Sequence, residues 1–307
     1  MISYLSNLFD RLPRATGAAL IMIFVAMLIS LMHAAIRITT SELHPFEVAF
    51  FRNFFGFLVL FPVLMRTGRS ALQTSRWPAH LLRTMFQFIS MTAFFFGISM
   101  LPLAKASALM FTAPLFATIF AVFILGEKIR ARRVSALALG FIGMLIIVRP
   151  AGGTIDLGSI LIIIAAAGLA CMLISIKSLS DTESSLSITA IGSMMMTVIS
   201  IGPAIMIWQW PTIEQSIWLF MVGAIGSLAH YLVAQAMSRA EASELMSYDF
   251  TKLVWASFLG FLFFSEIPSW WTLAGGLLIF SSTAYIAYRE TRIGKVAITE
   301  ESVNERF

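Results

Sequence analysis

The sequence predicts an all-α integral membrane protein with ten transmembrane helices arranged as two inverted five-helix repeats. Three observations support this fold class: the composition, the length of the apolar runs, and an internal duplication. Hydrophobic residues make up 59% of the chain and charged residues only 12%, whereas a soluble domain carries about 25% charged residues. The mean hydropathy is +0.88. A large soluble core is excluded because too few polar residues remain to cover it.

The apolar runs are long enough to cross a bilayer repeatedly. A hydrocarbon core of about 30 Å requires about 20 helical residues. Continuous runs without alternation favour helices over barrel strands. Seven stretches lack charged residues: Ala15–Ile36, Thr84–Ala104, Ala106–Gly126, Leu157–Ile176, Ser184–Ile213, Gln215–Ser238 and Ile267–Tyr288. Three more spans, around Pro45–Met65, Val134–Val148 and Ala242–Ser265, complete the ten.

The loop charges predict the orientation. Lysine and arginine concentrate on the cytoplasmic side of membrane proteins. The cation-rich segments are the two tails and the second and fourth loops, with Arg11, Arg14, Arg66, Arg69, Arg76, Lys128, Arg130, Arg132, Arg133, Arg289, Arg292 and Lys295. The first apolar run, of about 22 residues, exceeds the apolar core of a signal peptide and is interpreted as an uncleaved span. We therefore expect a multi-pass protein of a bacterial-type inner (plasma) membrane with both termini in the cytoplasm.

A duplication explains why the chain repeats itself. Residues 101–110, LPLAKASALM, and 237–246, MSRAEASELM, share five of ten positions. Pro62 and Pro203, and Gly140 and Gly276, recur at nearly the same separation. We predict two units, residues 16–149 and 156–290. Because each holds an odd number of spans, the second unit enters the membrane inverted, an arrangement typical of secondary transporters.

Two stretches resemble the EamA-type transporters of the drug/metabolite transporter superfamily. They are LPLAKASALMFTAPLFATIFAVFILGEKIRARRVSALALGFIGMLIIVRP and the earlier FFRNFFGFLVLFPV. The second half carries SYDFTKLVW, where the Tyr–Asp order is transposed relative to the family form, so the resemblance transfers the position of a polar cluster rather than each role. The resemblance implies a secondary active transporter that moves a small organic solute by alternating access. The main expectation is efflux of an amino acid or other metabolite; the alternative is uptake of a vitamin, nucleoside or quaternary amine.

Other classes of protein lack support in the sequence. The four histidines have no metal-site spacing, Cys171 is the single cysteine, and no P-loop motif occurs. We therefore expect no enzyme activity, no metal, no cofactor and no nucleic acid, although a membrane-embedded enzyme or a channel stays open as an alternative. The expected partners are a small-molecule substrate, the lipid bilayer and a coupling proton, with the protein a monomer or homodimer.

Polar residues within the predicted spans are the candidates for substrate binding or coupling. An ionisable group at mid-bilayer costs about 2.5–3.5 kcal/mol on insertion scales, so it is a functional candidate by default. Arg52 either has a functional role or pairs structurally with a helix-end carbonyl or an acid such as Glu47. Asp249 and Lys252 either neutralise each other or serve a substrate or a proton. The full candidate set is His33, Arg52, Gln87, Phe95, Phe111, Thr112, His230, Tyr231, Gln235, Tyr248, Asp249, Lys252 and Trp255.

Overall fold

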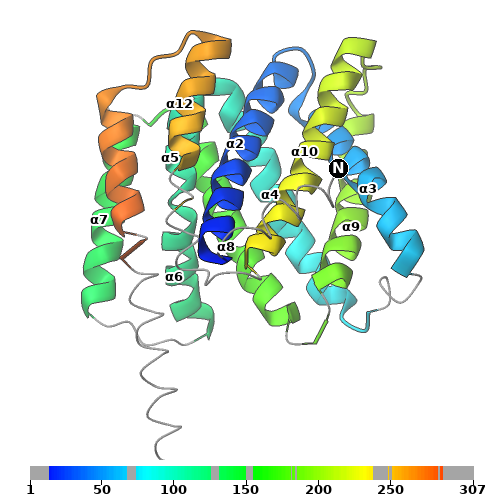
Figure 1. Cartoon of the computed structure of the whole chain (residues 1–307), viewed down its shortest axis with the longest axis horizontal. Helices are drawn as coiled ribbons and strands as arrows, with labels where there is room; N and C mark the ends of the chain where they lie inside the picture. The colour runs from blue at the N-terminus through cyan, green and yellow to red at the C-terminus, as the bar shows by residue number, and fades with distance from the viewer. Residues whose placement is uncertain are drawn as a thin grey trace, which may run out of the picture.

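Helices make up the whole of the described architecture (Figure 1). The computed structural model describes residues 14–67, 74–125, 131–149, 155–180, 182–183, 185–237, 248, 251–282 and 284–285. The helices are α2 (Arg14–Thr40), α3 (Pro45–Thr67), α4 (Trp77–Met100), α5 (Leu103–Met110), α6 (Ala113–Leu125), α7 (Ala131–Val148), α8 (Leu157–Ser180), α9 (Ser185–Ile205), α10 (Ile213–Met237) and α12 (Thr251–Phe264). A further apolar helix spans Trp270–Ser282.

These helices confirm the predicted fold class. Each of the ten predicted spans contains a helix within the described residues, with α5 and α6 sharing one span. By length and composition, five of the described helical segments can cross a membrane: Gly17–Thr40, Trp77–Met100, Leu103–Phe120, Leu157–Ile176 and Ser187–Ile205. Shorter apolar helices occupy Val134–Val148, Ile213–Ala229, Thr251–Phe264 and Trp270–Ser282.

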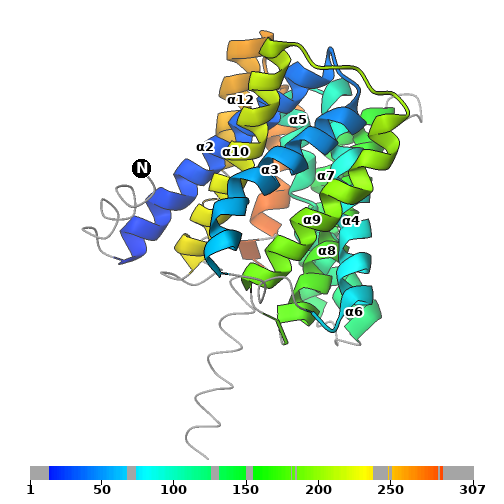
Figure 2. The same cartoon turned by 90° about the vertical axis from the view of Figure 1, so that its right-hand side faces the viewer.

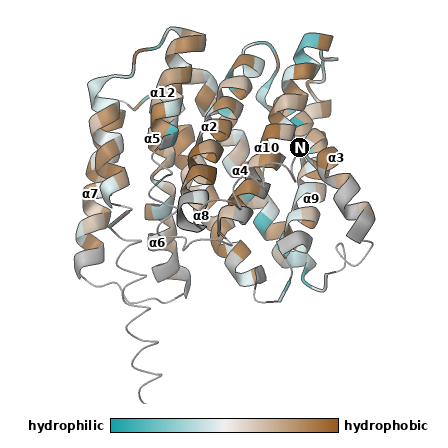
Figure 3. Cartoon of the chain, in the orientation of Figure 1, coloured by the Kyte–Doolittle hydropathy of each residue, from teal (hydrophilic) through white to brown (hydrophobic). Residues whose placement is uncertain are grey.

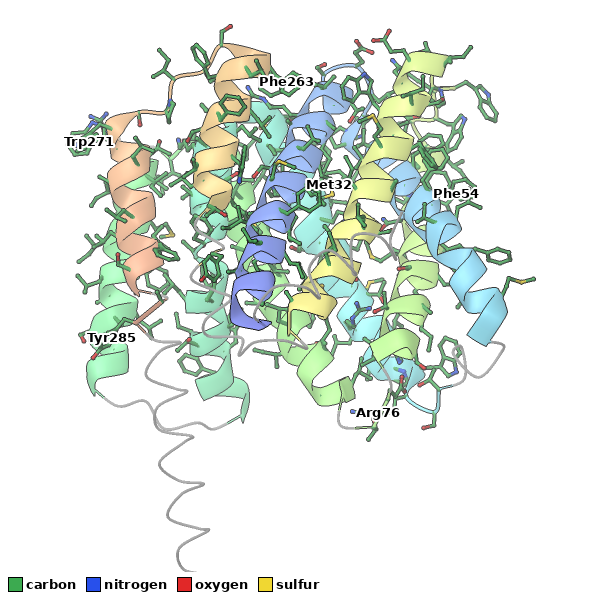
Figure 4. All side chains as sticks on the ribbon, in the orientation of Figure 1. Met32, Phe54, Arg76, Phe263, Trp271 and Tyr285 are labelled. Carbon is green, nitrogen blue, oxygen red and sulfur yellow. The ribbon has the colours of Figure 1, made fainter. Side chains whose placement is uncertain are left out.

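The outer faces of the helices are apolar (Figure 3). Large hydrophobic side chains such as Leu58, Val198, Phe258 and Leu277 are exposed on them. In Figure 4, Phe54 on α3 likewise points away from the bundle. Such exposure suits a surface in contact with lipid, where the helix satisfies its own backbone hydrogen bonds.

The most extensive helix contact joins α4 of the first half to α8 of the second, and the two lie side by side in Figure 2. Small residues allow this close approach. A Cβ added at Gly168 would lie 3.2 Å from the backbone nitrogen of Ser90. The Ser90 hydroxyl donates a hydrogen bond of 2.7 Å to the Ala165 carbonyl. Glycine and serine are typical of such interfaces because packing, rather than the hydrophobic effect, holds helices together in lipid.

A second close approach joins α7 to the helix Trp270–Ser282. A Cβ added at Gly143 would lie 2.8 Å from the Gly275 carbonyl oxygen, and one at Gly275 would lie 2.6 Å from the Gly143 carbonyl oxygen. The Ser282 hydroxyl donates to the Ala136 carbonyl. The two backbones are therefore in direct contact, and glycine is required at both positions.

The molecule has two ends, which we name from Figure 1. The upper end holds the last residues of α2, the first residues of α3 and α10, and the end of α12. The lower end holds the first residues of α4 and the turn between α8 and α9, next to Arg76 (Figure 4).

Candidate binding cavity

A cavity of about 400 Å³ lies between the two halves. Its first-half walls come from α2, α3, α5 and α6, and its second-half walls from α8, α10 and α12. Met32 occupies a central position on α2 (Figure 4). The lining residues are Ile29, Met32, His33, Arg52, Ser107, Met110, Phe111, Ala113, Pro114, Leu169, Leu173, Gly226, Ala229, Val233 and Lys252. A mostly apolar concave surface with a few polar groups is typical of a small-molecule site.

Arg52 brings a guanidinium into this apolar surface. Its Nη1 lies 3.4 Å from the Met91 sulfur and 3.5 Å from Asn53 Oδ1, while Nε has no hydrogen-bond partner among the described residues. Asn53 is fixed by a 2.8 Å hydrogen bond from its Nδ2 to the Ala49 carbonyl. A Cβ added at Gly226 on α10 would lie 3.7 Å from Arg52 Nη2. The arginine therefore extends from α3 across to the backbone of α10.

Three further polar groups line the cavity. Ser107, on α5, is only 6% exposed, and its hydroxyl has no hydrogen-bond partner among the described residues. His33, on α2, places its ring 4.5 Å from that of Phe94. Lys252 lies in the first turn of α12, where its carbonyl accepts a 3.2 Å hydrogen bond from Ser30 of α2. Ser107 was not among the sequence candidates, because one serine in an apolar helix gives no sequence signal.

The helix that forms one wall is interrupted at the cavity. α5 ends at Met110 and α6 begins at Ala113, with Phe111 and Thr112 between them. Pro114 has no N–H to donate to a carbonyl of the preceding turn, so one helical hydrogen bond is missing next to the interruption. Interrupted helices at the centre of a membrane bundle are common at the binding sites of secondary transporters.

The remaining sequence candidates either do not line the cavity or lie outside the described residues. Phe95 is buried in the core, and the Thr112 hydroxyl donates to the Leu109 carbonyl in the last turn of α5. Gln87 lies on α4 and Trp255 on α12, and neither lines the cavity. Tyr248 packs against the apolar cluster between α2 and α10. Asp249 and the side chains of His230, Tyr231 and Gln235 lie outside the described residues.

Of the structural alternatives for Arg52, pairing with Glu47 does not occur in the structure, because Glu47 has another partner. Glu47 is fully buried, and its Oε1 accepts a hydrogen bond of 2.5 Å from the Gln209 backbone N–H, in the second half of the chain. Glu47 therefore joins the two halves at the upper end, and the Arg52 guanidinium stays available to the cavity.

Polar contacts join the halves at the upper end. Arg37 Nη2 lies 2.6 Å from Glu266 Oε1, and the Leu103 N–H at the start of α5 donates to Glu266 Oε2 at 3.0 Å. Ser265, with φ of 55°, ends α12 in the left-handed region just before Glu266. A second ion pair joins Lys105 Nζ to Asp156 Oδ2 at 2.8 Å.

A different set of polar contacts joins the two halves at the lower end. His80 Nε2 lies 2.6 Å from Glu183 Oε2, and Thr74 donates to the same carboxylate. Burial raises the pKa of Glu183, but the hydrogen bonds from Thr74 and His80 outweigh it, so the net pKa lies below the ordinary value. Arg76 adds a 2.8 Å hydrogen bond to the Ser178 carbonyl. No sequence pattern indicates this contact, because its partners lie about a hundred positions apart.

The fold and the cavity define a membrane carrier class, and the comparisons with known proteins identify its family. Residues 16–149 and 156–288 each match the EamA-like transporter family. The chain therefore belongs to the EamA-like transporter family, and it is a transporter rather than an enzyme.

Two relatives and one solved structure illustrate the similarity. An S-adenosylmethionine uptake transporter of Rickettsia bellii (strain RML369-C) is 34% identical over 252 residues, covering 82% of this chain and 87% of the relative. A riboflavin transporter of Vibrio cholerae is 31% identical over 249 residues, covering 80% and 83%. A crystal structure at 18% identity matches with a TM-score of 0.61, covering 91% of this chain and 99% of the other, and shows the same fold.

Proposed function

We propose that the protein is a secondary transporter that takes up a heterocyclic metabolite, with S-adenosylmethionine as the first substrate to test. The supporting observation is the apolar cavity between the halves in a chain 34% identical to an S-adenosylmethionine uptake transporter. Phe111 and the methionines Met32 and Met110 give the cavity a polarisable surface suited to a planar ring. The named relatives favour the uptake alternative over efflux.

The transport step in this proposal is alternating access. The upper end, with its cation-poor loops, faces away from the cytoplasm. Contacts such as Arg37–Glu266 hold that end together in the present arrangement. Toward the lower end, α2 and α10 diverge from α4 and α8 (Figure 2). Because α4 and α8 form the most extensive interface, we place the pivot there.

Riboflavin is the second candidate substrate. The observation that favours it is the 31% identity to a riboflavin transporter over 80% of this chain. An isoalloxazine ring would use the same apolar surface as a purine, so the two candidates compete for one site.

Counterflow in proteoliposomes tests the proposal. Vesicles containing the purified protein are loaded with unlabelled S-adenosylmethionine and diluted into a trace of the tritiated compound. A transporter for this substrate accumulates label transiently above equilibrium, and excess external S-adenosylmethionine abolishes the accumulation. Inhibition by riboflavin at lower concentration, with no S-adenosylmethionine counterflow, would assign the second substrate instead. Absence of counterflow with either compound would overturn both assignments.

The direction of transport requires a separate measurement. Cells that express the protein are incubated with labelled S-adenosylmethionine, and initial uptake is compared with cells that express an Arg52→Gln variant. Faster initial uptake by the unaltered protein is expected. Faster loss of label from preloaded cells, without faster uptake, would restore efflux as the function.

A further inference from the structure

Part of the cavity wall differs chemically from the rest. Arg52, Ser107, Lys252 and His33 line the cavity from α3, α5, α12 and α2, while the other lining residues are apolar. No carboxylate occurs among the described lining residues. Every polar side chain among them can donate a hydrogen bond, and Arg52 and Lys252 bring positive charge, in surroundings that strengthen electrostatic attraction.

Two of these groups have hydrogen-bonding capacity that no described residue uses. Arg52 Nε and the Ser107 hydroxyl are buried and have no hydrogen-bond partner among the described residues. Ser107 is more than nine-tenths buried and lines the cavity directly. Buried polar groups are nearly always paired in native proteins, so an exception needs an explanation. A ligand that accepts hydrogen bonds supplies one.

The contacts that Arg52 does make leave it free to receive a ligand. Its Nη1 reaches a methionine sulfur and, at 3.5 Å, an amide oxygen, both poor substitutes for a carboxylate. In the described residues the ion pairs are Arg37–Glu266, His80–Glu183 and Lys105–Asp156, and Arg52 belongs to none of them. Guanidinium binds carboxylate and phosphate through two parallel hydrogen bonds, a geometry that a lysine does not reproduce.

We propose that Arg52 and Ser107, with the charge of Lys252, form an anion-binding part of the cavity wall, and that the transported solute carries a carboxylate or phosphate which docks there. The heterocycle of the solute then lies against Phe111 and the methionines. For S-adenosylmethionine, the anionic group is the carboxylate of its methionine part. The inference rests on the proposed function only in taking this cavity as the transport site.

Binding of matched ligands tests the inference. The probes are S-adenosylmethionine and its decarboxylated form, measured by thermal shift and by competition on the detergent-purified protein. We expect the carboxylate to strengthen binding by about tenfold, as a charge-assisted bidentate pair does. Arg52→Gln removes this preference, whereas Arg52→Lys retains part of it. The decarboxylated form binds Arg52→Gln at least as well as it binds the unaltered protein.

A pair of serine variants separates the loss of one specific hydrogen bond from a general disturbance of the fold. Ser107→Ala is expected to weaken binding of the carboxylate form about threefold to tenfold and to leave the decarboxylated form unchanged, as loss of one hydrogen bond predicts. Ser200→Ala removes an equally buried hydroxyl that donates within α9 to the Met196 carbonyl, and it leaves both affinities unchanged. If Arg52→Gln does not fold, Arg52→Lys and Ser107→Ala carry the test.

A second ligand pair separates this inference from the proposed substrate. Riboflavin 5′-phosphate and riboflavin differ only in the anionic group. If S-adenosylmethionine neither binds nor moves, but the phosphate ester binds more tightly than riboflavin and Arg52→Gln removes the difference, the anion-binding part of the wall stands and the substrate assignment fails. If neither anionic probe binds more tightly than its partner, the inference is wrong.

Discussion

Two carboxylates, Glu266 at the upper end and Glu183 at the lower end, each join the halves of the molecule, but in different surroundings. Glu266 and its partner Arg37 are partly exposed, at 21% and 18% of their side-chain surfaces. Glu183 and His80 are more enclosed, at 9% and 0%, and they extend the close-packed interface of α4 and α8. If the halves rock as proposed, we expect the enclosed pair beside the α4–α8 interface to persist and the partly exposed pair to break when the upper end opens.

The largest expected loss of stability comes from disrupting the α4–α8 interface. Gly168→Leu places a side chain where even a Cβ would lie 3.1 Å from the Ser90 side chain, so α4 and α8 must separate. We expect a loss of about 3 kcal/mol of stability, as overpacking predicts, measured as a lower melting temperature in detergent. Gly202→Leu is the matched control, since no atom lies within 4 Å of a Cβ there. Equal melting temperatures for the two variants would show that α4 and α8 are not tightly joined.

The lower carboxylate should have the next largest effect. Glu183→Gln keeps the size of the side chain but removes the charge that His80 contacts at 2.6 Å, leaving a buried imidazole poorly paired. We expect a loss of about 2 kcal/mol in chemical unfolding of the purified protein. His80→Gln combined with Glu183→Gln should cost less than the sum of the single changes, because the two side chains interact. If the losses of stability from the two single changes add strictly, His80 and Glu183 do not stabilise the protein through their mutual contact.

The upper carboxylate should affect opening more than stability. Glu266→Gln removes a partly exposed ion pair, for which about 1 kcal/mol is expected, equivalent to about a fivefold change in an equilibrium. In a Cys171→Ser, Met110→Cys background, a membrane-impermeant thiol reagent applied from the upper side should label the cavity about five times faster. Glu214→Gln, at an exposed position at the start of α10, is the control. Unchanged labelling would remove Arg37–Glu266 from the set of contacts that close this end.

The smallest expected effect is on the stability of the folded protein at acid pH. Since the pKa of Glu183 is lowered in the folded protein, the unfolded chain binds more protons as the pH approaches its ordinary value of 4.5. The stabilisation is fully present above that value and is lost as the pH falls through the lower, folded pKa. Melting temperatures measured from pH 7 to pH 3 should therefore fall less steeply for Glu183→Gln than for the unaltered protein. Parallel curves would contradict the assigned role.

The architecture was predictable from the sequence because it depends on local quantities. Apolar run length, loop charge and the duplication each require only neighbouring residues or a fixed offset. Arg52, His33, Phe111 and Lys252 were singled out because polar or aromatic groups within a span are conspicuous, and all four line the cavity.

The pairings were not predictable, because they join residues from different halves. Glu47 reaches Gln209 and Glu183 reaches His80, contacts that depend on how the helices pack and not on spacing. Thr112 shows a second reason. A hydroxyl within a span can donate to a carbonyl of the preceding turn, as this one does with the Leu109 carbonyl, so a sequence alone does not distinguish a structural hydroxyl from one with a role toward substrate.

The contact of Gly143 with Gly275 has a consequence for biosynthesis. α7 is the fifth span to leave the ribosome, while the helix that its backbone touches is the tenth. Until the last span has been synthesised, Gly143 lacks the backbone that it contacts in the finished protein. Closure of this part of the bundle therefore waits for the final span, and a nascent chain that stops after nine spans leaves the α7 glycine without its partner.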